Sequence, residues 1–222
     1  MTSICPTITA ATADEYRQQV ERIAPFATRV HIDIADGTLA PSRLVDVANI
    51  WWPGGVRADL HIMTKRPLAH LQMYIALGPQ LVIVHAEGEG NFVALAEQLH
   101  HHGIEVGVAL LPQTPVENIV PALELIDHVL IFSGNFGHFG GHADMTLLDK
   151  VRQLKAAKPT LEIGWDGGVS DDNIYALAQG GVEVMNVGGY LHRVSHPEAA
   201  YARLESVLRP PQNPRSHRIR VV

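Results

Sequence analysis

The chain has 222 residues, 46% of them hydrophobic, and its 17 basic and 23 acidic side chains give a formal net charge of −6. This length suits one domain with a single large core, and the negative charge argues against nucleic acid or an anionic membrane as a partner. The single cysteine, Cys5, excludes an intramolecular disulfide and suits a reducing compartment, and because no stretch resembles a secretion signal or a membrane span we expect a cytoplasmic protein.

Short runs rich in β-branched residues alternate along the chain with longer segments whose apolar residues recur every three or four positions. The short runs predict eight strands, at 4–8, 29–34, 57–63, 80–86, 104–110, 127–133, 160–165 and 182–187. The longer segments predict helices at 14–24, 67–78, 91–103, 115–126, 145–157, 170–181 and 196–208. The segment 42–54, after the second strand, has the weakest helical pattern.

Counting that weak unit, eight units of strand and helix follow one another, which is typical of a (β/α)8 barrel. A doubly wound open sheet is the second choice. It would leave unexplained the eighth unit and the lack of a Gly-rich dinucleotide-binding turn after the first strand. We therefore predict one (β/α)8 TIM barrel over 1–208 and a basic, Pro-containing C-terminal tail over 209–222.

The segment 31–37, HIDIADG, carries polar side chains within an apolar run. Because successive side chains of a strand point to opposite faces, His31 and Asp33 share one face, and Ile32 and Ile34 share the other. An edge strand with a wet face would explain this pattern, and so would a functional site at the carboxyl ends of parallel barrel strands. The side chains at or near those ends are Thr7, His31, Asp33, His61, Met63, His85, Ser133 and Asp166.

Four of these side chains, those of His31, Asp33, His61 and Asp166, come from three strands and could converge above the barrel mouth. Two imidazoles and two carboxylates suit one divalent metal ion, which could be Zn, Fe, Mn or Co. A structural metal site would more typically use thiolates, so the pattern favours an open catalytic site. Taken singly, a histidine at a strand end is more often only hydrogen-bonded, and we interpret the triplet 100–102, HHH, as the solvated end of a helix.

Three late loops are rich in glycine, at 133–142, 166–170 and 187–190. Loops after the seventh and eighth strands of such barrels often bind phosphate through backbone N–H groups and the start of a short helix. A single Gly-Gly pair is weak evidence, since turns need glycine in any case. Three successive loops that face the His/Asp set are a stronger indication of a phosphorylated substrate.

Seven segments, in order and at the right spacing between residues 4 and 192, resemble the ribulose-phosphate 3-epimerase family. They are HIDIADG, ADLHIM, VHAEG, VGVALLPQTPVE, SGNFGHFGG, GWDGGVSDDNI and VEVMNVGG. The resemblance implies a barrel of the ribulose-phosphate-binding type and an isomerase of carbohydrate metabolism that interconverts D-ribulose 5-phosphate and D-xylulose 5-phosphate. It also implies a homo-oligomer, a dimer or larger.

The resemblance extends to single residues, and it implies that His31, Asp33, His61 and Asp166 hold a divalent metal ion. The substrate and its phosphate would be contacted by Thr7, Met63, Ser133, Gly140, Gly141, Gly167, Gly188 and Gly189. The chemistry agrees with these residue types, because inverting a carbon beside a carbonyl requires removing a proton from one face and returning one to the other, through an enediolate. Asp33 and Asp166 are expected to act as the base and the acid.

Several positions depart from the family pattern. Ala35 and Phe132 stand where the family typically has Met, Phe136 replaces a Pro in a loop that is one residue longer, and Trp165 replaces a Val. We expect these changes to alter the lining of the site, and they keep open another ketose phosphate, such as a hexulose 6-phosphate, and a non-catalytic sugar-phosphate binder. A metal-free decarboxylase or aldolase of a related barrel family is disfavoured, because ADLHIMT lacks the Lys of that family's Asp-x-Lys-x-x-Asp arrangement.

Overall fold

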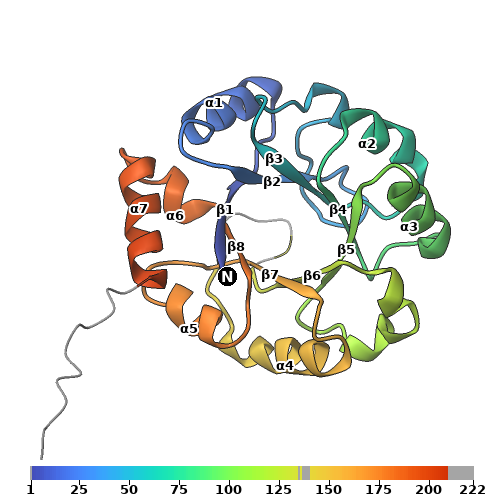
Figure 1. Cartoon of the computed structure of the whole chain (residues 1–222). Helices are drawn as coiled ribbons and strands as arrows, with labels where there is room; N and C mark the ends of the chain where they lie inside the picture. The colour runs from blue at the N-terminus through green and yellow to red at the C-terminus, as the bar shows by residue number, and fades with distance from the viewer. Residues whose placement is uncertain (1, 135, 137–140, 210–222) are drawn as a thin grey trace, which may run out of the picture.

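The computed structural model describes residues 2–134, 136 and 141–209. Eight parallel strands pair in chain order and close into a barrel, which Figure 1 shows from one end. The strands are β1 (Ser3–Ile8), β2 (Arg29–Ile34), β3 (Arg57–Ile62), β4 (Leu81–His85), β5 (Glu105–Leu110), β6 (His128–Phe132), β7 (Glu162–Asp166) and β8 (Val184–Val187). The predicted (β/α)8 barrel is confirmed, and every predicted strand is present with its ends within two residues.

Helices surround the barrel on its outer side (Figure 1). The α-helices are α1 (Ala13–Ile23), α2 (Leu71–Leu77), α3 (Phe92–His101), α4 (Leu148–Ala157), α5 (Ile174–Gln179), α6 (Gly189–His192) and α7 (Pro197–Leu208). The 3-10 helices are η1 (Val47–Asn49), η2 (Pro67–His70), η3 (Val116–Asn118), η4 (Val120–Leu125) and η5 (Met145–Leu147). Within the described residues, no helix has the length and apolar character needed to cross a membrane.

The prediction of an α-helix over 115–126 is wrong, because this segment forms the 3-10 helices η3 and η4. Pro121 accounts for the break: it has no N–H to donate, and its ring would clash with the carbonyl four residues earlier in an α-helix. The segment after β2 had the weakest helical pattern. It forms a long connection whose one helical element is the short 3-10 helix η1. Residues 210–222 of the predicted tail lie outside the described residues.

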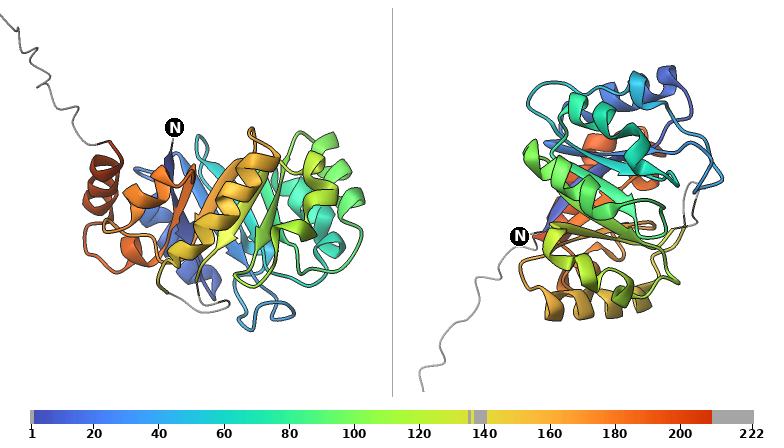
Figure 2. Two further views of the ribbon diagram at one scale, coloured as in Figure 1. Left: turned by 90° about the horizontal axis from the view of Figure 1, so that it is seen from below. Right: turned by 90° about the vertical axis from the view of Figure 1, so that its right-hand side faces the viewer.

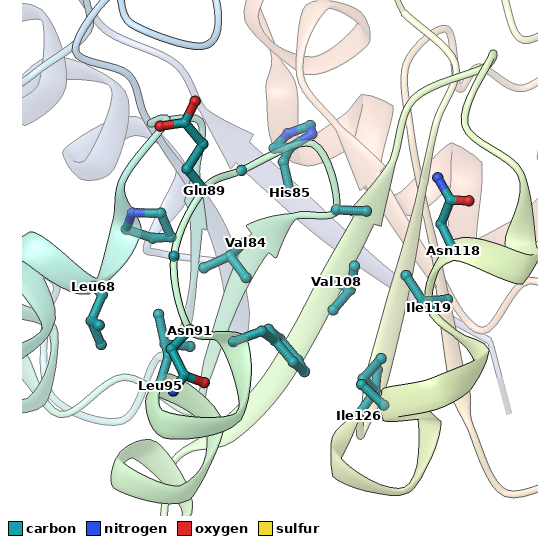
Figure 3. A pocket seen from close by; sticks show the side chains of 16 residues that line it. Leu68, Val84, His85, Glu89, Asn91, Leu95, Val108, Asn118, Ile119 and Ile126 are labelled. Carbon is teal, nitrogen blue, oxygen red and sulfur yellow. The ribbon is translucent and has the colours of Figure 1, made fainter.

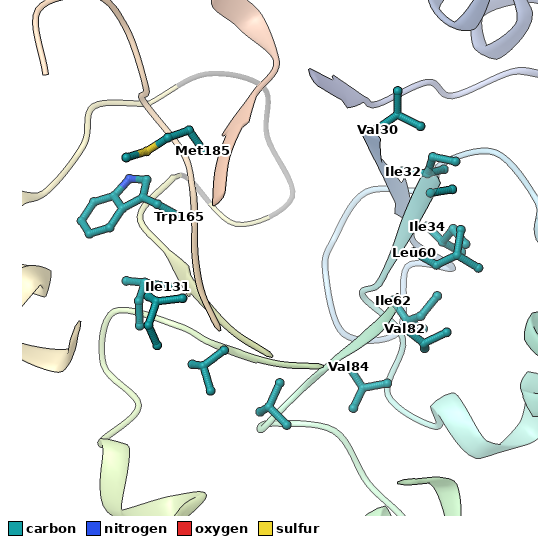
Figure 4. Packing of buried hydrophobic residues seen from close by; sticks show 14 of the residues in the cluster. Val30, Ile32, Ile34, Leu60, Ile62, Val82, Val84, Ile131, Trp165 and Met185 are labelled. Carbon is teal, nitrogen blue, oxygen red and sulfur yellow. The ribbon is translucent and has the colours of Figure 1, made fainter. Parts of the chain in front are cut away.

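Each strand divides its side chains between the outer core and the barrel interior. Val30, Ile32 and Ile34 of β2 are buried in the outer core, and Figure 4 shows such side chains directed away from the barrel axis. Other members of this layer labelled there are Leu60, Ile62, Val82, Val84, Ile131, Trp165 and Met185. The alternate residues of β2, including His31 and Asp33, therefore face the interior.

The interior is polar at the amino ends of the strands. Arg29 donates to Asp59 at 2.7 Å and through both terminal nitrogens to Glu162 at 3.1 and 3.0 Å, while His128 Nδ1 lies 2.8 Å from Glu162. We refer to these four residues as the floor network. An apolar cluster of Leu81, Ile83, Ala109 and Leu130 fills another part of the interior.

The two ends of the barrel differ in what covers them. In both views of Figure 2 the start of β1 lies at one end, and the long connection 35–56 lies at the other. That second end is the carboxyl end of the strands, where a barrel of this type carries its active site.

Candidate active site

The carboxyl ends of β2, β3 and β7 bring the four predicted metal ligands together. His31, Asp33, His61 and Asp166 each offer a ligand atom, and these atoms all lie within 4.8 Å of one another. The barrel register produces this convergence, because Asp33 of β2 is paired with His61 of β3. His31 stands two residues before Asp33, on the same face of β2.

Asp33 lies at the centre of this group. Its Oδ1 atom is 2.9 Å from Nδ1 of His61 and 3.3 Å from Nε2 of His31, while Asp166 Oδ2 is 3.9 Å from the same His61 nitrogen. The other oxygen of Asp33 accepts a hydrogen bond from Thr9 Oγ1 at 2.6 Å. Thr9 thus fixes one carboxylate oxygen, and the other faces the two imidazoles.

The donor set fits a divalent cation. The His31 ring is fully buried, and neither of its nitrogens has a hydrogen-bond partner of proper geometry among the described residues. An unpaired buried polar atom costs about 1–3 kcal/mol, so a ligand that bonded to this ring would recover free energy. A cation at the convergence point would satisfy it, and two imidazoles with two carboxylates suit Zn, Fe, Mn or Co.

The two carboxylates differ in their acidity in the protein alone. Burial acts to raise the pKa of Asp33, but the His31 and His61 rings beside it outweigh burial and hold this pKa well below its usual range. Burial, and then the charge of Asp33, raise the pKa of Asp166. Asp33 therefore favours the ionised form, whereas Asp166 retains a proton more readily.

Two polar residues outside this group of four, His85 and Glu87, extend from His61. Its Nε2 atom lies 2.9 Å from Nε2 of His85, whose Nδ1 atom lies 3.1 Å from a carboxylate oxygen of Glu87. Burial lowers the pKa of His85 to about 4, and the pKa of Glu87 falls to about 2 because hydrogen bonds from His85 and Thr114 outweigh its burial. Glu87 was not among the predicted site residues, although the segment VHAEG repeats the His-x-acid spacing of His31 and Asp33.

A cleft of about 850 Å³ lies beside the point where the four side chains converge. Most of the residues that were predicted to contact the substrate line this cleft. Its lining includes Thr7, Asp33, Met63, Phe132, Gly141, Asp166, Gly167, Gly188 and Gly189. Gly140 lies outside the described residues. Ser133 is at the end of β6, but its hydroxyl accepts a hydrogen bond from the backbone N–H of Asp144 at 2.7 Å, so it holds the loop after β6.

The residues that depart from the family pattern divide into two groups. Ala35 packs with Met63 and Phe136, and the Phe136 ring centroid is 4.9 Å from that of His85, so these residues surround the site. Trp165 is fully buried in the outer core and donates to the carbonyl oxygen of Gly167. The expectation that Trp165 alters the lining is therefore wrong, because strand alternation turns it away from Asp166.

The glycines of the late loops have different structural reasons. Gly167 has φ +112°, and a Cβ there would lie 2.2 Å from the backbone nitrogen of Gly134, so the close approach of two loops requires glycine. At Gly188 the nearest atom to an added Cβ is Thr7 Cβ at 3.5 Å, an ordinary contact. Packing by itself therefore does not require glycine at position 188.

Comparison with known families and proteins adds to this geometry. Residues 3–192 match the model of the Ribulose-phosphate 3 epimerase family. The ribulose-phosphate 3-epimerase of Helicobacter pylori strain J99 is 30% identical over 215 residues, covering 93% of this chain and 98% of that protein. The ribulose-phosphate 3-epimerase of Schizosaccharomyces pombe is 27% identical over 210 residues, covering 91% and 92%.

Solved structures share the fold at lower identity. A 3-keto-L-gulonate-6-phosphate decarboxylase from Vibrio cholerae superposes with a TM-score of 0.69 at 14% identity, over 93% of this chain and 97% of that chain. A 3-hexulose-6-phosphate synthase from Salmonella typhimurium gives a TM-score of 0.66 at 15% identity, over 94% and 98%. These structures are similar in fold.

Proposed function

Because the chain belongs to the ribulose-phosphate 3-epimerase family, we propose that it is an isomerase that interconverts D-ribulose 5-phosphate and D-xylulose 5-phosphate by proton transfer at C3. The observation that carries this proposal is the convergence of two carboxylates and two imidazoles within 4.8 Å at the carboxyl end of the barrel. A redox cofactor is not needed for this chemistry, since only a proton is removed and returned.

One divalent ion per chain, of Zn, Fe, Mn or Co, would be held by His31, Asp33, His61 and Asp166. When bound, it would supply positive charge that stabilises negative charge developing on the substrate oxygens. The unpaired nitrogens of the buried His31 ring support this assignment.

Asp33 and Asp166 are the proposed proton-transfer groups, and both line the cleft. In one direction a carboxylate oxygen of Asp33 accepts the C3 proton, which leaves an enediolate, and the carboxyl group of Asp166 returns a proton to the opposite face. The two roles exchange in the reverse direction. In the protein alone the pKa of Asp33 is lowered and that of Asp166 is raised, and this difference supports opposite roles for the two carboxyl groups.

The phosphate is proposed to bind to backbone N–H groups of the loops after β6, β7 and β8, at Gly140, Gly141, Gly167, Gly188 and Gly189. Backbone donors in such loops attract an anion without a cationic side chain. Thr7 and Met63 would contact the sugar, and their place in the cleft lining supports this role. Ser133 would act through the loop that its hydroxyl holds.

A longer ketose phosphate, such as a hexulose 6-phosphate, is the second candidate substrate. Ala35, which is small, packs beside Met63 next to a cleft of about 850 Å³. Alanine at position 35 leaves more room than the Met that the family typically has there. The added room favours a substrate with one more carbon. Rates measured in parallel on the pentulose and hexulose phosphates decide between the two candidates.

We further propose that the protein acts in the cytoplasm as a homo-oligomer. The single buried cysteine suits a reducing compartment, and the family resemblance supports self-association. The measurement is the mass in solution, compared with 24.2 kDa for one chain.

The proposal is tested with Asp33→Asn and Asp166→Asn, measured beside the parent for metal content, C3 epimerisation and deuterium uptake from D₂O. Asn keeps the size but removes the basicity, so each metal-loaded variant should lose roughly 10²- to 10⁴-fold in epimerisation rate. Each should still exchange the proton of the one epimer whose base survives.

Asp36→Asn serves as the control. The Asp36 carboxylate accepts hydrogen bonds from Thr38 in the loop after β2 and is not one of the four converging residues. A metal-loaded Asp33 or Asp166 variant that epimerises within about tenfold of the parent removes that residue from proton transfer. Ligand binding without any deuterium uptake by the parent would identify a sugar-phosphate binder instead.

A further inference from the structure

We propose that His85 and Glu87 are positioning residues, which fix the proton of His61 on Nε2 so that its Nδ1 lone pair faces the cation. This inference rests on the metal site proposed above and deepens it. It assigns a role to two residues that are not among the four ligands.

The rings of His61 and His85 share one proton. His61 Nε2 and His85 Nε2 are 2.9 Å apart, and both residues are buried. Two imidazole nitrogens at this distance require one proton between them, because two lone pairs or two N–H groups would repel. The distance does not itself say which ring carries that proton.

Glu87 decides which ring carries it. A carboxylate only accepts hydrogen bonds, so at 3.1 Å from Glu87 the His85 Nδ1 atom must be the N–H donor. A neutral His85 then presents a lone pair at Nε2, and the shared proton belongs to His61 Nε2. His61 Nδ1 is left with a lone pair that points at Asp33 Oδ1, 2.9 Å away.

That last contact connects the chain of hydrogen bonds to the cation. A nitrogen lone pair and a carboxylate oxygen at 2.9 Å repel unless positive charge lies beside both. His31 Nε2 approaches the same oxygen to 3.3 Å without hydrogen-bond geometry, and it has no other hydrogen-bond partner among the described residues. The tautomer set by Glu87 therefore prepares His61 as a metal ligand, the role that a hydrogen-bonded partner commonly has for a ligating histidine.

Glu87 is itself held by a neighbouring loop. Its Oε1 atom accepts hydrogen bonds from the backbone N–H of Leu111, at 3.2 Å, and from the hydroxyl of Thr114. Lys150 of α4 donates to the carbonyl oxygens of Leu111 and Thr114 at 2.7 and 2.6 Å, which fixes that loop. The orientation of His61 on β3 thus depends on β4, the loop after β5, and α4.

A matched control lies two residues further along the chain. The carboxylate of Glu89 pairs with Lys65 at 2.8 Å and Arg66 at 3.5 Å. Figure 3 shows Glu89 and the His85 ring well apart, at the rim of an apolar cavity of about 160 Å³ on the outer side of β4 and β5. Glu89→Gln therefore removes a carboxylate from the same loop without changing the partners of His85.

The experiment measures Co²⁺ affinity by competition with a chromophoric chelator, in the parent, Glu87→Gln, Thr114→Val and Glu89→Gln. Loss of an outer partner of a ligating histidine typically weakens metal binding by about 10–100-fold, and we expect this for Glu87→Gln. Thr114→Val should give a smaller loss in the same direction, since the Glu87 carboxylate remains. Glu89→Gln should match the parent.

A second readout follows the protons directly. In the metal-free protein, where no cation holds Nδ1 of His61, ¹⁵N-histidine NMR should show protonated Nε2 in His61 and protonated Nδ1 in His85, and Glu87→Gln should lose this single pattern. A purely structural role for Glu87 would leave the tautomers unchanged. Thr114→Val, which keeps every ionisable group, provides the affinity test if Glu87→Gln does not fold.

Co²⁺ affinity within about twofold of the parent in both Glu87→Gln and Thr114→Val, below the loss expected for such a partner, overturns the inference while the metal site stands. The opposite tautomer in the parent, with protonated Nδ1 in His61, overturns it as well. A parent protein that binds no Co²⁺ overturns the metal site and this inference together. None of these measurements uses a sugar phosphate, so their results do not depend on which ketose phosphate the protein binds.

Discussion

Two buried side chains at the barrel mouth, those of His31 and Asp33, have surroundings that cost free energy in the protein alone. His31 is fully buried, and neither of its ring nitrogens has a hydrogen-bond partner of proper geometry among the described residues, while Asp33 is buried beside two imidazoles. An unsatisfied buried polar group costs about 1–3 kcal/mol, and a ligand that supplies the missing partner recovers that cost. Binding to the folded chain then stabilises it by mass action.

His61→Ala should lose most of the bound metal, because removing a ligand leaves a coordination position that supporting residues cannot fill. The measurement is metal content per chain after desalting. His100→Ala is the control, since His100 pairs with Asp127 near the end of α3 in the surface triplet. Full occupancy in the folded His61→Ala protein would remove His61 from the ligand set.

The loops after β7 and β8 use glycine for different purposes. Gly167 and Gly168 have positive φ angles and pack directly on the backbone of the loop after β6. Gly188, which precedes the four-residue helix α6, has room for a side chain. The first loop thus needs glycine for its conformation, whereas the second leaves its backbone accessible from the cleft.

Gly188→Asp should weaken binding of the phosphorylated ketose by about tenfold or more, because like charges in close contact cost several kcal/mol and about 1.4 kcal/mol already corresponds to tenfold. KM and direct binding to inorganic phosphate are the measurements. Gly188→Ala separates charge from volume, since its Cβ makes an ordinary contact with Thr7, and it should bind phosphate nearly as well as the parent. Unchanged affinity in folded Gly188→Asp would place the phosphate elsewhere.

At the amino end of the barrel, the floor network links β2, β3, β6 and β7 across the interior. Burial acts to raise the pKa of Glu162, but His128 and Arg29 outweigh it and hold this pKa well below the usual range. A lowered carboxylate pKa in the folded state contributes stability above the unfolded pKa, about 4.3 for Glu, and that stability is lost as the pH falls toward the folded value. Acid should therefore destabilise the entire fold through this end of the barrel.

Glu162→Gln should reduce the dependence of unfolding free energy on pH below about pH 5, where the unfolded glutamate begins to bind protons. The measurement is urea unfolding of parent and variant at pH 7 and pH 4. Some acid sensitivity should remain, because Asp33 and Glu87 also have lowered pKa values. Glu21→Gln, an exposed change on α1, should follow the parent, and an equal pH dependence in Glu162→Gln would exclude this carboxylate as a cause.

The sequence by itself determined the barrel and the strand ends at which His31, Asp33, His61 and Asp166 lie, because the two-residue period of a strand and the three-to-four-residue period of a helix are local properties. His31 and Asp33 could be placed on one inward face of β2 from spacing alone, and the order of the strands followed from the eight repeated units. Tertiary structure decided whatever depends on distant neighbours. The pairing of β2 with β3 sets Asp33 beside His61, and the packing of β7 places Trp165 in the outer core. Contacts between loops and strands connect Glu87 to His61 through His85. Such contacts join residues on different elements, so their geometry arises only when the sheet closes into a ring and the loops pack against it.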